Sequence, residues 1–459
     1  MNRLSNFQYW IRFVILASVF LVGWFVFWEI KNQGWLRLAD FSSILPVSQE
    51  HRSDIEALSL IADKLTHTNG EVRTFLILFQ NNLELRPGGG FIGSFGILKV
   101  KDGTIVEFAT HDTGNFDGRI PSTITPPYPM STLLRIDSWK LRDSNFSPDF
   151  PTNARQAITF YAMGDGQEHF DGVIGITTEV LESVLKITGP VTLDGFPGTY
   201  AADKAVIDLE YQVEQGYRDQ NIAAGERKSV LKILGDVILT KVKALPVDKQ
   251  YELFTTMLRD LHSKAIQVYF VDEYLQGVVA DAGWDGAVDS TWHDDSFMLI
   301  DANLGALKSD YHMRRRIEYT VDLSKEVPQA TLKMIYTHTG VARNWYTKDY
   351  ISYLRAYLPE GSFITSVTNG DAPVYGNDLG KKYVGVTVGV PLASERTVTF
   401  EYTLPKTIDT SEWYNLKVTK QSGVTGTPLS VTIIDKQGKI KTFNETLNRD
   451  FVLSERENE

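Results

Sequence analysis

The chain has 459 residues, of which 43% are hydrophobic and 12% aromatic, so it is long enough for two domains with sizeable cores and has the composition of a folded protein. Its formal net charge of -11 argues against non-specific nucleic-acid binding, which needs a basic face, and leaves only local basic pockets as anion sites. The absence of cysteine excludes disulfides and thiolate chemistry.

The first feature along the chain is an unbroken apolar run over residues 13–28, FVILASVFLVGWFVFW, preceded by Arg3 and Arg12. With its apolar neighbours, and at about 1.5 Å per residue, this run can span a bilayer as a helix. No small-residue cleavage site follows it, so we predict an uncleaved single-pass membrane anchor over residues 1–30 instead of a signal peptide. The two arginines predict a cytoplasmic N-terminus and place the bulk of the chain outside the cytoplasmic membrane.

Residues 31–70 are predicted to form a stalk and a leading helix, and residues 71–305 a mixed α/β domain, because apolar runs there alternate between strand and helix spacing. The Asp102-Gly103 step predicts a hairpin turn. The proline-rich segment 114–151 is too long and too broken for one regular element, which is typical of functional or mobile loops. We expect strands over 73–80, 91–100, 104–110, 170–176 and 265–271, and helices over 152–161, 177–188, 202–214, 225–243, 247–262 and 272–282.

From Arg314 onward the pattern changes to short alternating runs separated by Gly, Pro and Asn turns. Six or seven short strands predict an all-β, immunoglobulin-like sandwich over residues 310–445. Residues 446–459 are predicted to be a flexible tail.

The most informative motif is NNLELRPGGGFIGS over residues 81–94, which follows an apolar strand. It places the guanidinium of Arg86 beside glycines, notably Gly89 and Gly90, whose backbone N–H groups can approach an anion closely. This combination favours an anionic ligand such as a phosphate. The alternative is a tight turn that needs glycine only for positive φ.

Other charged side chains lie at strand ends and in loops of the same predicted domain. Arginine suits a phosphate because its planar fork donates two parallel hydrogen bonds, and an acidic residue among arginines can hold Mg²⁺ or act as a base. Taken singly, each residue can equally be a surface ion pair or a solvated charge. The candidates are His111, Asp112, Arg142, Asp143, Arg155, Arg218 and Arg227.

Four segments occur in the order ILFQNNLELRPGGGFIGSFG, FDGVIGITTEVLESVLKITGPVTL, QVYFVDEYLQ and FMLIDANLGALKSDYHMRRRIEYTV. Together they resemble the bacterial domain-of-unknown-function 4012 family over residues 70–325. The order of motifs is more distantly similar to that of the LytR-CpsA-Psr enzymes, membrane-anchored phosphotransferases that move a glycopolymer from a polyprenyl-pyrophosphate carrier to a cell-wall acceptor.

The second resemblance implies a mechanism. Arg86, Arg218 and Arg227 would neutralise the pyrophosphate, Mg²⁺ held by Asp112 would bridge its oxygens, and Asp112 or His111 would deprotonate the acceptor hydroxyl. The helices over 177–188 and 225–243 would flank the polyprenyl tail. The chain departs from the pattern at His111, where the family has arginine, and at Lys228, where it usually has glutamine.

The competing hypothesis is a non-catalytic envelope protein that binds glycan or lipid, or has a structural role at the cell surface. The two hypotheses differ in a structural expectation. A transferase requires Arg86, Asp112, Arg218 and Arg227 to converge on one cleft beside an apolar cavity, whereas scattered positions favour the binding or structural role.

Overall fold

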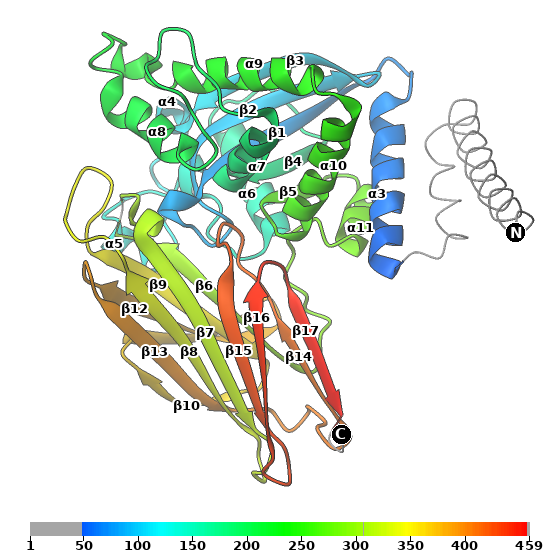
Figure 1. Ribbon diagram of the computed structural model, residues 1–459, viewed down its shortest axis with the longest axis vertical. Coiled ribbons are helices and arrows are strands. Elements are labelled where there is room, and N and C mark those ends of the chain that lie inside the picture. Colours follow the sequence, from blue (N-terminus) through cyan, green and yellow to red (C-terminus); the bar gives the residue numbers. More distant parts are fainter. Residues whose placement is uncertain (1–47, 306, 457–459) are drawn as a thin grey trace, which may run out of the picture.

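The computed structural model describes residues 48–305 and 307–456, which form an α/β part and a β-rich part placed end to end (Figure 1). The predicted anchor and most of the predicted stalk lie outside the described residues. Among the residues described, no helix combines the length and apolar character that crossing a membrane requires.

The α/β part is built on a five-stranded sheet with the strand order β3-β2-β1-β4-β5. The central strand β1 pairs antiparallel with β2 and parallel with β4, and β5 closes the sheet antiparallel to β4. The predicted β-meander is confirmed, with its turn at Asp102 and Gly103. The strands are β1 (Val72–Asn81), β2 (Phe91–Lys101), β3 (Thr104–Asp112), β4 (Gly172–Thr177) and β5 (Ile266–Phe270).

Strand β1 is apolar on both faces because helices cover both sides of the sheet. Leu76 and Leu78 join a core with helix α6 (Phe150–Met163) and the segment before it. Phe75 and Ile77 point the other way, into a core with the helices α3 (Gln49–Thr66), α10 (Val247–His262) and α11 (Glu273–Asp281).

A separate group of helices, here called the cap, lies over the sheet edge formed by β2 and β3 (Figure 1). It has its own apolar core, which includes Leu185, Leu209 and Leu234. The cap consists of α7 (Thr178–Thr188), α8 (Ala205–Tyr211), the π-helical η4 (Gln212–Gly216), η5 (Ala224–Glu226) and α9 (Ser229–Lys243).

The proline-rich segment contains only single turns of helix and packs its apolar residues under α6. Phe116, Ile120 and Leu141 are buried there, so this long connection is part of the core of the α/β part. Its elements are α4 (Thr113–Phe116), η2 (Asp117–Arg119), α5 (Met130–Leu133) and η3 (Leu141–Asp143).

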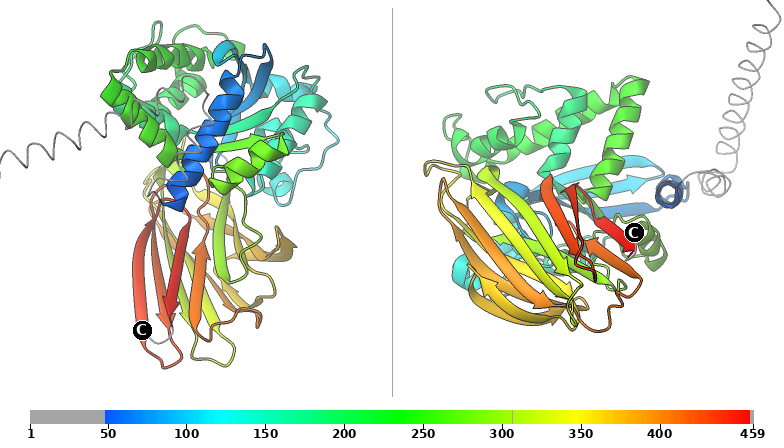
Figure 2. Two further views of the ribbon diagram at one scale, coloured as in Figure 1. Left: turned by 90° about the vertical axis from the view of Figure 1, so that its right-hand side faces the viewer. Right: turned by 60° about the horizontal axis from the view of Figure 1, so that its bottom comes forward.

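Two six-stranded sheets form the β-rich part and face each other across one apolar core (Figure 2). One has the order β10-β13-β8-β7-β15-β16 and the other β11-β12-β9-β6-β14-β17. The strands are β6 (Asp295–Asn303), β7 (Met313–Asp322), β8 (Gln329–His338), β9 (Tyr350–Pro359), β10 (Phe363–Thr368), β11 (Asp371–Asp378), β12 (Lys381–Val390), β13 (Glu395–Thr403), β14 (Trp413–Val418), β15 (Thr427–Ile434), β16 (Ile440–Leu447) and β17 (Phe451–Arg456), with η6 (Ser309–His312) before β7.

Two of these strands lie outside the predicted limits of the sandwich. Strand β6 falls in the stretch assigned to the α/β domain, yet it pairs with β9 and β14 in the second sheet. Strand β17 falls in the predicted tail and pairs with β14. All nine residues of β6 are buried, so it shows no alternation, and its partners are distant in sequence. The structure therefore moves the boundary between the two parts to the segment before Asp295.

Candidate functional site

The glycine-rich loop predicted to bind an anion lies in the interface between the α/β part and the β-rich part. Arg86 is 3% exposed, and its Nε donates to Asp143 Oδ1 at 2.9 Å. Its Nη1 donates to the carbonyl oxygen of Asn303, in β6, at 2.8 Å. The guanidinium also lies over the ring of Phe91. Arg86 and Asp143, both candidate ligand-binding residues, thus form an interior ion pair.

The glycines of this loop are required by close packing in the same interface. A Cβ on Gly90 would lie 2.4 Å from the backbone of Asn81, and one on Gly89, which has φ +133°, would lie 2.8 Å from Ser422 Oγ. From the β-rich part, Gly423 approaches so closely that a Cβ there would lie 1.9 Å from the Gly89 carbonyl oxygen. Only glycine allows these backbones to touch.

Buried hydrogen bonds complete this interface, which we call the joint. Gln421 Nε2 donates to the carbonyl oxygens of Arg86 and Asp301, at 3.2 and 2.8 Å. Ser422 Oγ donates to the carbonyl oxygen of Lys264, whose Nζ pairs with Asp450 at 2.7 Å. Because buried polar groups here are paired across the two parts, separating the parts would leave them unsatisfied.

The second predicted group, His111 and Asp112, ends the edge strand β3 beside the cap. Asp112 Oδ1 accepts the N–H of Gly114 and pairs with Lys228 Nζ at 3.0 Å. His111 stacks on Phe95 with ring centroids 5.0 Å apart. Burial, with a smaller contribution from Arg119, lowers the pKa of His111, so its ring is neutral at pH 7.

The cap brings Arg227 and Lys228 to this edge, just ahead of α9. Lys228 Nζ also donates to the carbonyl oxygen of Gly93 at the start of β2. Desolvation lowers the pKa of Lys228, against the opposing effect of Asp112. Arg227 pairs loosely with Glu214 at 3.5 Å, and a third of its side chain is exposed. The structure therefore brings Asp112, Lys228 and Arg227 together at one place, which we call the cap edge.

Three glutamates that the sequence did not mark as a site surround Lys308, and one of them, Glu214, also pairs with Arg227. Lys308 Nζ, in the segment that follows β6, pairs with Glu84 at 2.8 Å and with Glu210 at 3.2 Å, and it lies 4.0 Å from Glu214. Although desolvation opposes it, these carboxylates raise the pKa of Lys308 above its usual range. Nothing in the sequence links Lys308 to the cap, whereas Lys228 was marked by its place beside Arg227.

The remaining predicted residues lie elsewhere. Arg142 Nε pairs with Asp117 Oδ2 at 2.5 Å in the proline-rich segment. Arg155 is exposed on α6, over the ring of Tyr269. Arg218 is exposed and stacks on Tyr217. Among the described residues, no hydrogen bond or ion pair connects these three arginines, or Arg86, to the cap edge.

The predicted magnesium ligand was Asp112. Its carboxylate already accepts from an ammonium and a backbone amide, which fits a cation-paired capping residue better than a metal ligand. Within the part of the chain that is described, no three His, Asp or Glu side chains gather closely enough to hold a metal ion. We therefore derive no chemical step through Mg²⁺.

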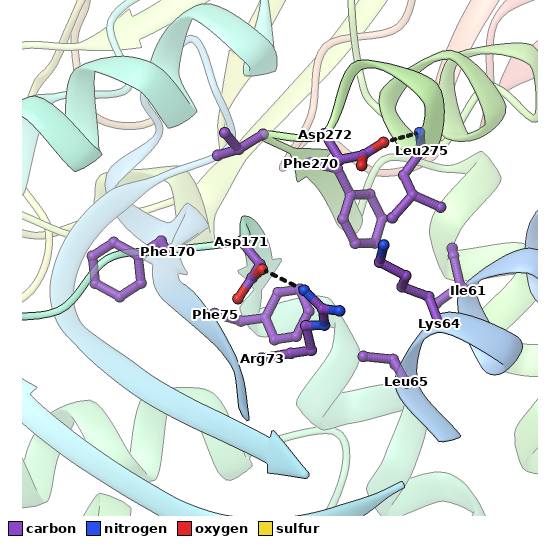
Figure 3. A pocket seen from close by; sticks show the side chains of 11 residues that line it. Ile61, Lys64, Leu65, Arg73, Phe75, Phe170, Asp171, Phe270, Asp272 and Leu275 are labelled. Carbon is purple, nitrogen blue, oxygen red and sulfur yellow. Dashed lines mark hydrogen bonds and ion pairs between the residues drawn. The ribbon is translucent and has the colours of Figure 1, made fainter. Parts of the chain in front are cut away.

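A pocket of about 290 Å³ opens at the start of β1, between α3, β1 and α11 (Figure 3). None of the predicted site residues lines it. Its walls carry Phe75, Phe270 and Leu275 together with Lys64 and Arg73.

No curated protein sequence matches the chain. Among solved structures, gbs0355 from Streptococcus agalactiae is 11% identical, with a TM-score of 0.30, over 47% of this chain and 74% of that one. The Lin1025 protein from Listeria innocua is 13% identical, with a TM-score of 0.25, over 50% of this chain and 86% of that one.

The family comparison covers the first two of the four segments described above, and the other two lie beyond it. It matches residues 70–213, from just before β1 to η4, and so includes both the glycine-rich loop and the Asp112 turn. Over residues 70–213 the chain matches the family described as a protein of unknown function (DUF4012), a shorter range than the predicted 70–325.

Proposed function

We propose that this chain is an extracytoplasmic cell-envelope protein, held by an N-terminal single-pass helix, that binds an anionic envelope lipid or glycan without transferring it. The observation that carries this proposal is the burial of Arg86, which pairs with Asp143 inside the joint. A transferase of the LytR-CpsA-Psr kind would need this arginine at its pyrophosphate. Because Arg86 is buried in the joint, the glycine-rich loop connects the two parts of the chain, and the anionic ligand would bind at another surface.

The anionic group of the ligand would lie at the cap edge. Arg227 has only a loose partner at 3.5 Å, and Lys228 is a cation whose charged form is disfavoured by desolvation. An added phosphate would satisfy both cations through charge-assisted hydrogen bonds. The apolar part of a lipid would follow the cap, whose helices have a core separate from that of the sheet.

The β-rich part would act as a rigid extension of the binding domain. Buried hydrogen bonds and touching glycines fix the joint, so a ligand at the cap edge would be held at a set distance from the far end of the sandwich. The immunoglobulin-like strand arrangement stays a prediction for this part, and we propose that its far end contacts other envelope proteins.

The proposal is tested by native mass spectrometry of the full chain in detergent micelles with an added polyprenyl pyrophosphate. We expect one bound lipid per chain and at least a tenfold weaker complex for Arg227→Ala combined with Lys228→Gln, since each charge-assisted contact contributes about 1 kcal/mol or more. Lys232→Ala is the matched control, because it removes an exposed lysine from the same helix. Equal binding by all three proteins would contradict the proposal.

Glycopolymer phosphotransfer is a second candidate, favoured by the contact between Asp112 and Lys228, the residue that follows Arg227. In that reaction the acceptor hydroxyl oxygen attacks the sugar-linked phosphorus, the P–O–P bond breaks, polyprenyl phosphate leaves, and the hydroxyl proton passes to Asp112 or His111. The residues fit the reaction only if Asp112 releases Lys228.

Incubation of the full chain with a polyprenyl-pyrophosphate-linked oligosaccharide and cell-wall acceptor separates the two candidates. The binding proposal expects no polyprenyl phosphate to be released, with or without added Mg²⁺. Release that stops in Asp112→Asn would instead establish the transferase.

A further inference from the structure

The pocket between α3, β1 and α11 has an apolar floor and a charged mouth. Phe75, Phe270 and Leu275, each 5% exposed, and Phe170, which is 9% exposed, form the floor. Lys64 and Asp272 are exposed at the mouth. The volume of about 290 Å³ is at the lower end of the range for small-molecule sites, about 300–1,000 Å³.

Most charges around this pocket are already paired. Arg73 contacts both Glu71 and Asp171, the latter at 3.4 Å. The other oxygen of Asp171 accepts the backbone N–H of Thr74 at 2.8 Å. Asp272 caps α11 by accepting the N–H of Leu275 at 3.0 Å. An incoming amine would therefore have to compete with existing partners for every carboxylate.

Lys64 is the exception. In the described part of the chain it makes no hydrogen bond or ion pair, and its side chain reaches from α3 towards the ring of Phe270 (Figure 3). Its place in the last turn of α3 explains a lysine, since a cation is favoured at a helix C-terminus. The position at the end of α3 does not explain why the ammonium group lies beside a pocket lined by Phe75 and Phe270.

We propose that this pocket binds a small organic acid with an apolar or aromatic body. The carboxylate pairs with Lys64 Nζ at the mouth, and the body lies against Phe75, Phe270 and Leu275. The apolar contacts supply most of the affinity, and the ammonium group selects an anion over a neutral or cationic analogue. This site shares no residue with the cap edge, so the proposal can be correct or wrong independently of the proposed function.

The test uses the full chain in detergent micelles and three probes with the same phenylpropyl body: 3-phenylpropanoate, 3-phenylpropan-1-ol and 3-phenylpropylamine. Binding is followed by ligand-observed NMR with titration. We expect saturable binding of the acid, about fivefold to tenfold tighter than the alcohol, and weaker binding of the amine. Lys64→Met should reduce acid binding to the level of the alcohol and leave the alcohol unchanged.

Two further variants locate the site. Ile61→Trp, on the α3 wall of the pocket, should abolish binding of acid and alcohol alike because it fills the apolar space. Lys232→Met removes an exposed lysine from α9 and should change nothing. The thermal unfolding midpoint of each variant verifies that it is folded.

Three results would overturn the proposal: no saturable binding of the acid, equal affinity for acid and amine, or an unchanged acid affinity in Lys64→Met. Binding that survives Ile61→Trp would place the acid elsewhere on the protein and would overturn it as well.

Discussion

The joint and the cap edge use the same side-chain chemistry in opposite surroundings. Each contains a cation, a carboxylate and a nearby glycine, and each comes from a segment that favours an anion site in the sequence. In the joint the Arg86–Asp143 pair is 3% and 6% exposed, whereas at the cap edge the Lys228–Asp112 pair is 18% and 13% exposed. The β-rich part contacts the first pair, whereas the second pair joins the cap to the end of β3.

A glycine-rich loop with an arginine is therefore compatible with two opposite roles. Glycine lets backbone approach a ligand, but it equally lets one backbone approach another. The deciding contact is Gly423, which lies in the β-rich part and touches the Gly89 carbonyl oxygen. Predicted effects on stability should therefore be large at the joint and small at the cap edge.

The largest expected effect is that of Arg86→Ala. The substitution leaves Asp143 buried without its cation, which costs about 3–5 kcal/mol of unfolding free energy. Urea unfolding measures it. Arg155→Ala, at an exposed arginine on α6, is the control and should cost less than about 1 kcal/mol. Equal losses would mean that Arg86 is not held as the structure describes.

Gly423→Ala should have the second-largest effect and lower the unfolding free energy by roughly 2–4 kcal/mol. The loss comes from backbone strain at φ +77° and from the collision of the new Cβ with the Gly89 carbonyl oxygen. Gly438→Ala is matched in backbone, with φ +81°, but has nothing within 4 Å of the added Cβ. It should lose only about 1 kcal/mol. If both variants lose the same amount, the close contact across the joint does not exist.

At the cap edge, Lys228→Gln should cost about 1 kcal/mol or less, because the amide can still donate to Gly93 and Asp112 keeps the N–H of Gly114. Unfolding in urea provides the comparison with Arg86→Ala. A loss as large as that of Arg86→Ala would remove the contrast between the two regions.

The smallest effect concerns pH. The pKa of His111 is lowered in the folded chain, so as pH falls below 6.5 the unfolded chain takes up the proton first and stability decreases. Relative to His111→Phe, which keeps the ring on Phe95, the wild type should lose less than about 0.5 kcal/mol between pH 7.5 and pH 5.5, since the ring is partly exposed and solvent screens its charge. If the wild type instead became more stable relative to His111→Phe as the pH fell from 7.5 to 5.5, the pKa of His111 would be raised in the folded chain, contrary to the prediction.

Much of the α/β part follows from local pattern. The apolar run in β1 and the Asp102-Gly103 turn predict the meander, and the helical stripes predict α7, α9 and α10. The assignment of β6 to the β-rich part could not be predicted in this way. A fully buried strand has no alternation of apolar and polar residues, and β6 pairs with β9 and β14, which are distant in sequence.

The site was predictable only in part, for a related reason. Asp112 and Arg227 are local signals at the ends of elements, and the structure brings them to one edge. The burial of Arg86 depends on contacts with Gln421, which is 335 residues away in the chain, and with β6. No spacing rule connects residues at that separation, so burial of the loop could not be inferred from the loop itself.

Hydrogen–deuterium exchange of the full chain in detergent micelles, with and without a polyprenyl pyrophosphate, shows whether the ligand binds at the cap edge or at the glycine-rich loop. We expect the amides of Gly88 and Gly89 to exchange slowly in both states, since the N–H of Gly88 donates to the carbonyl oxygen of Asn145 and that of Gly89 to the carbonyl oxygen of Arg86. Added lipid should protect residues around Asp112 and Arg227. Fast exchange at Gly88 and Gly89 that slows when lipid binds would show that the loop is an anion site after all.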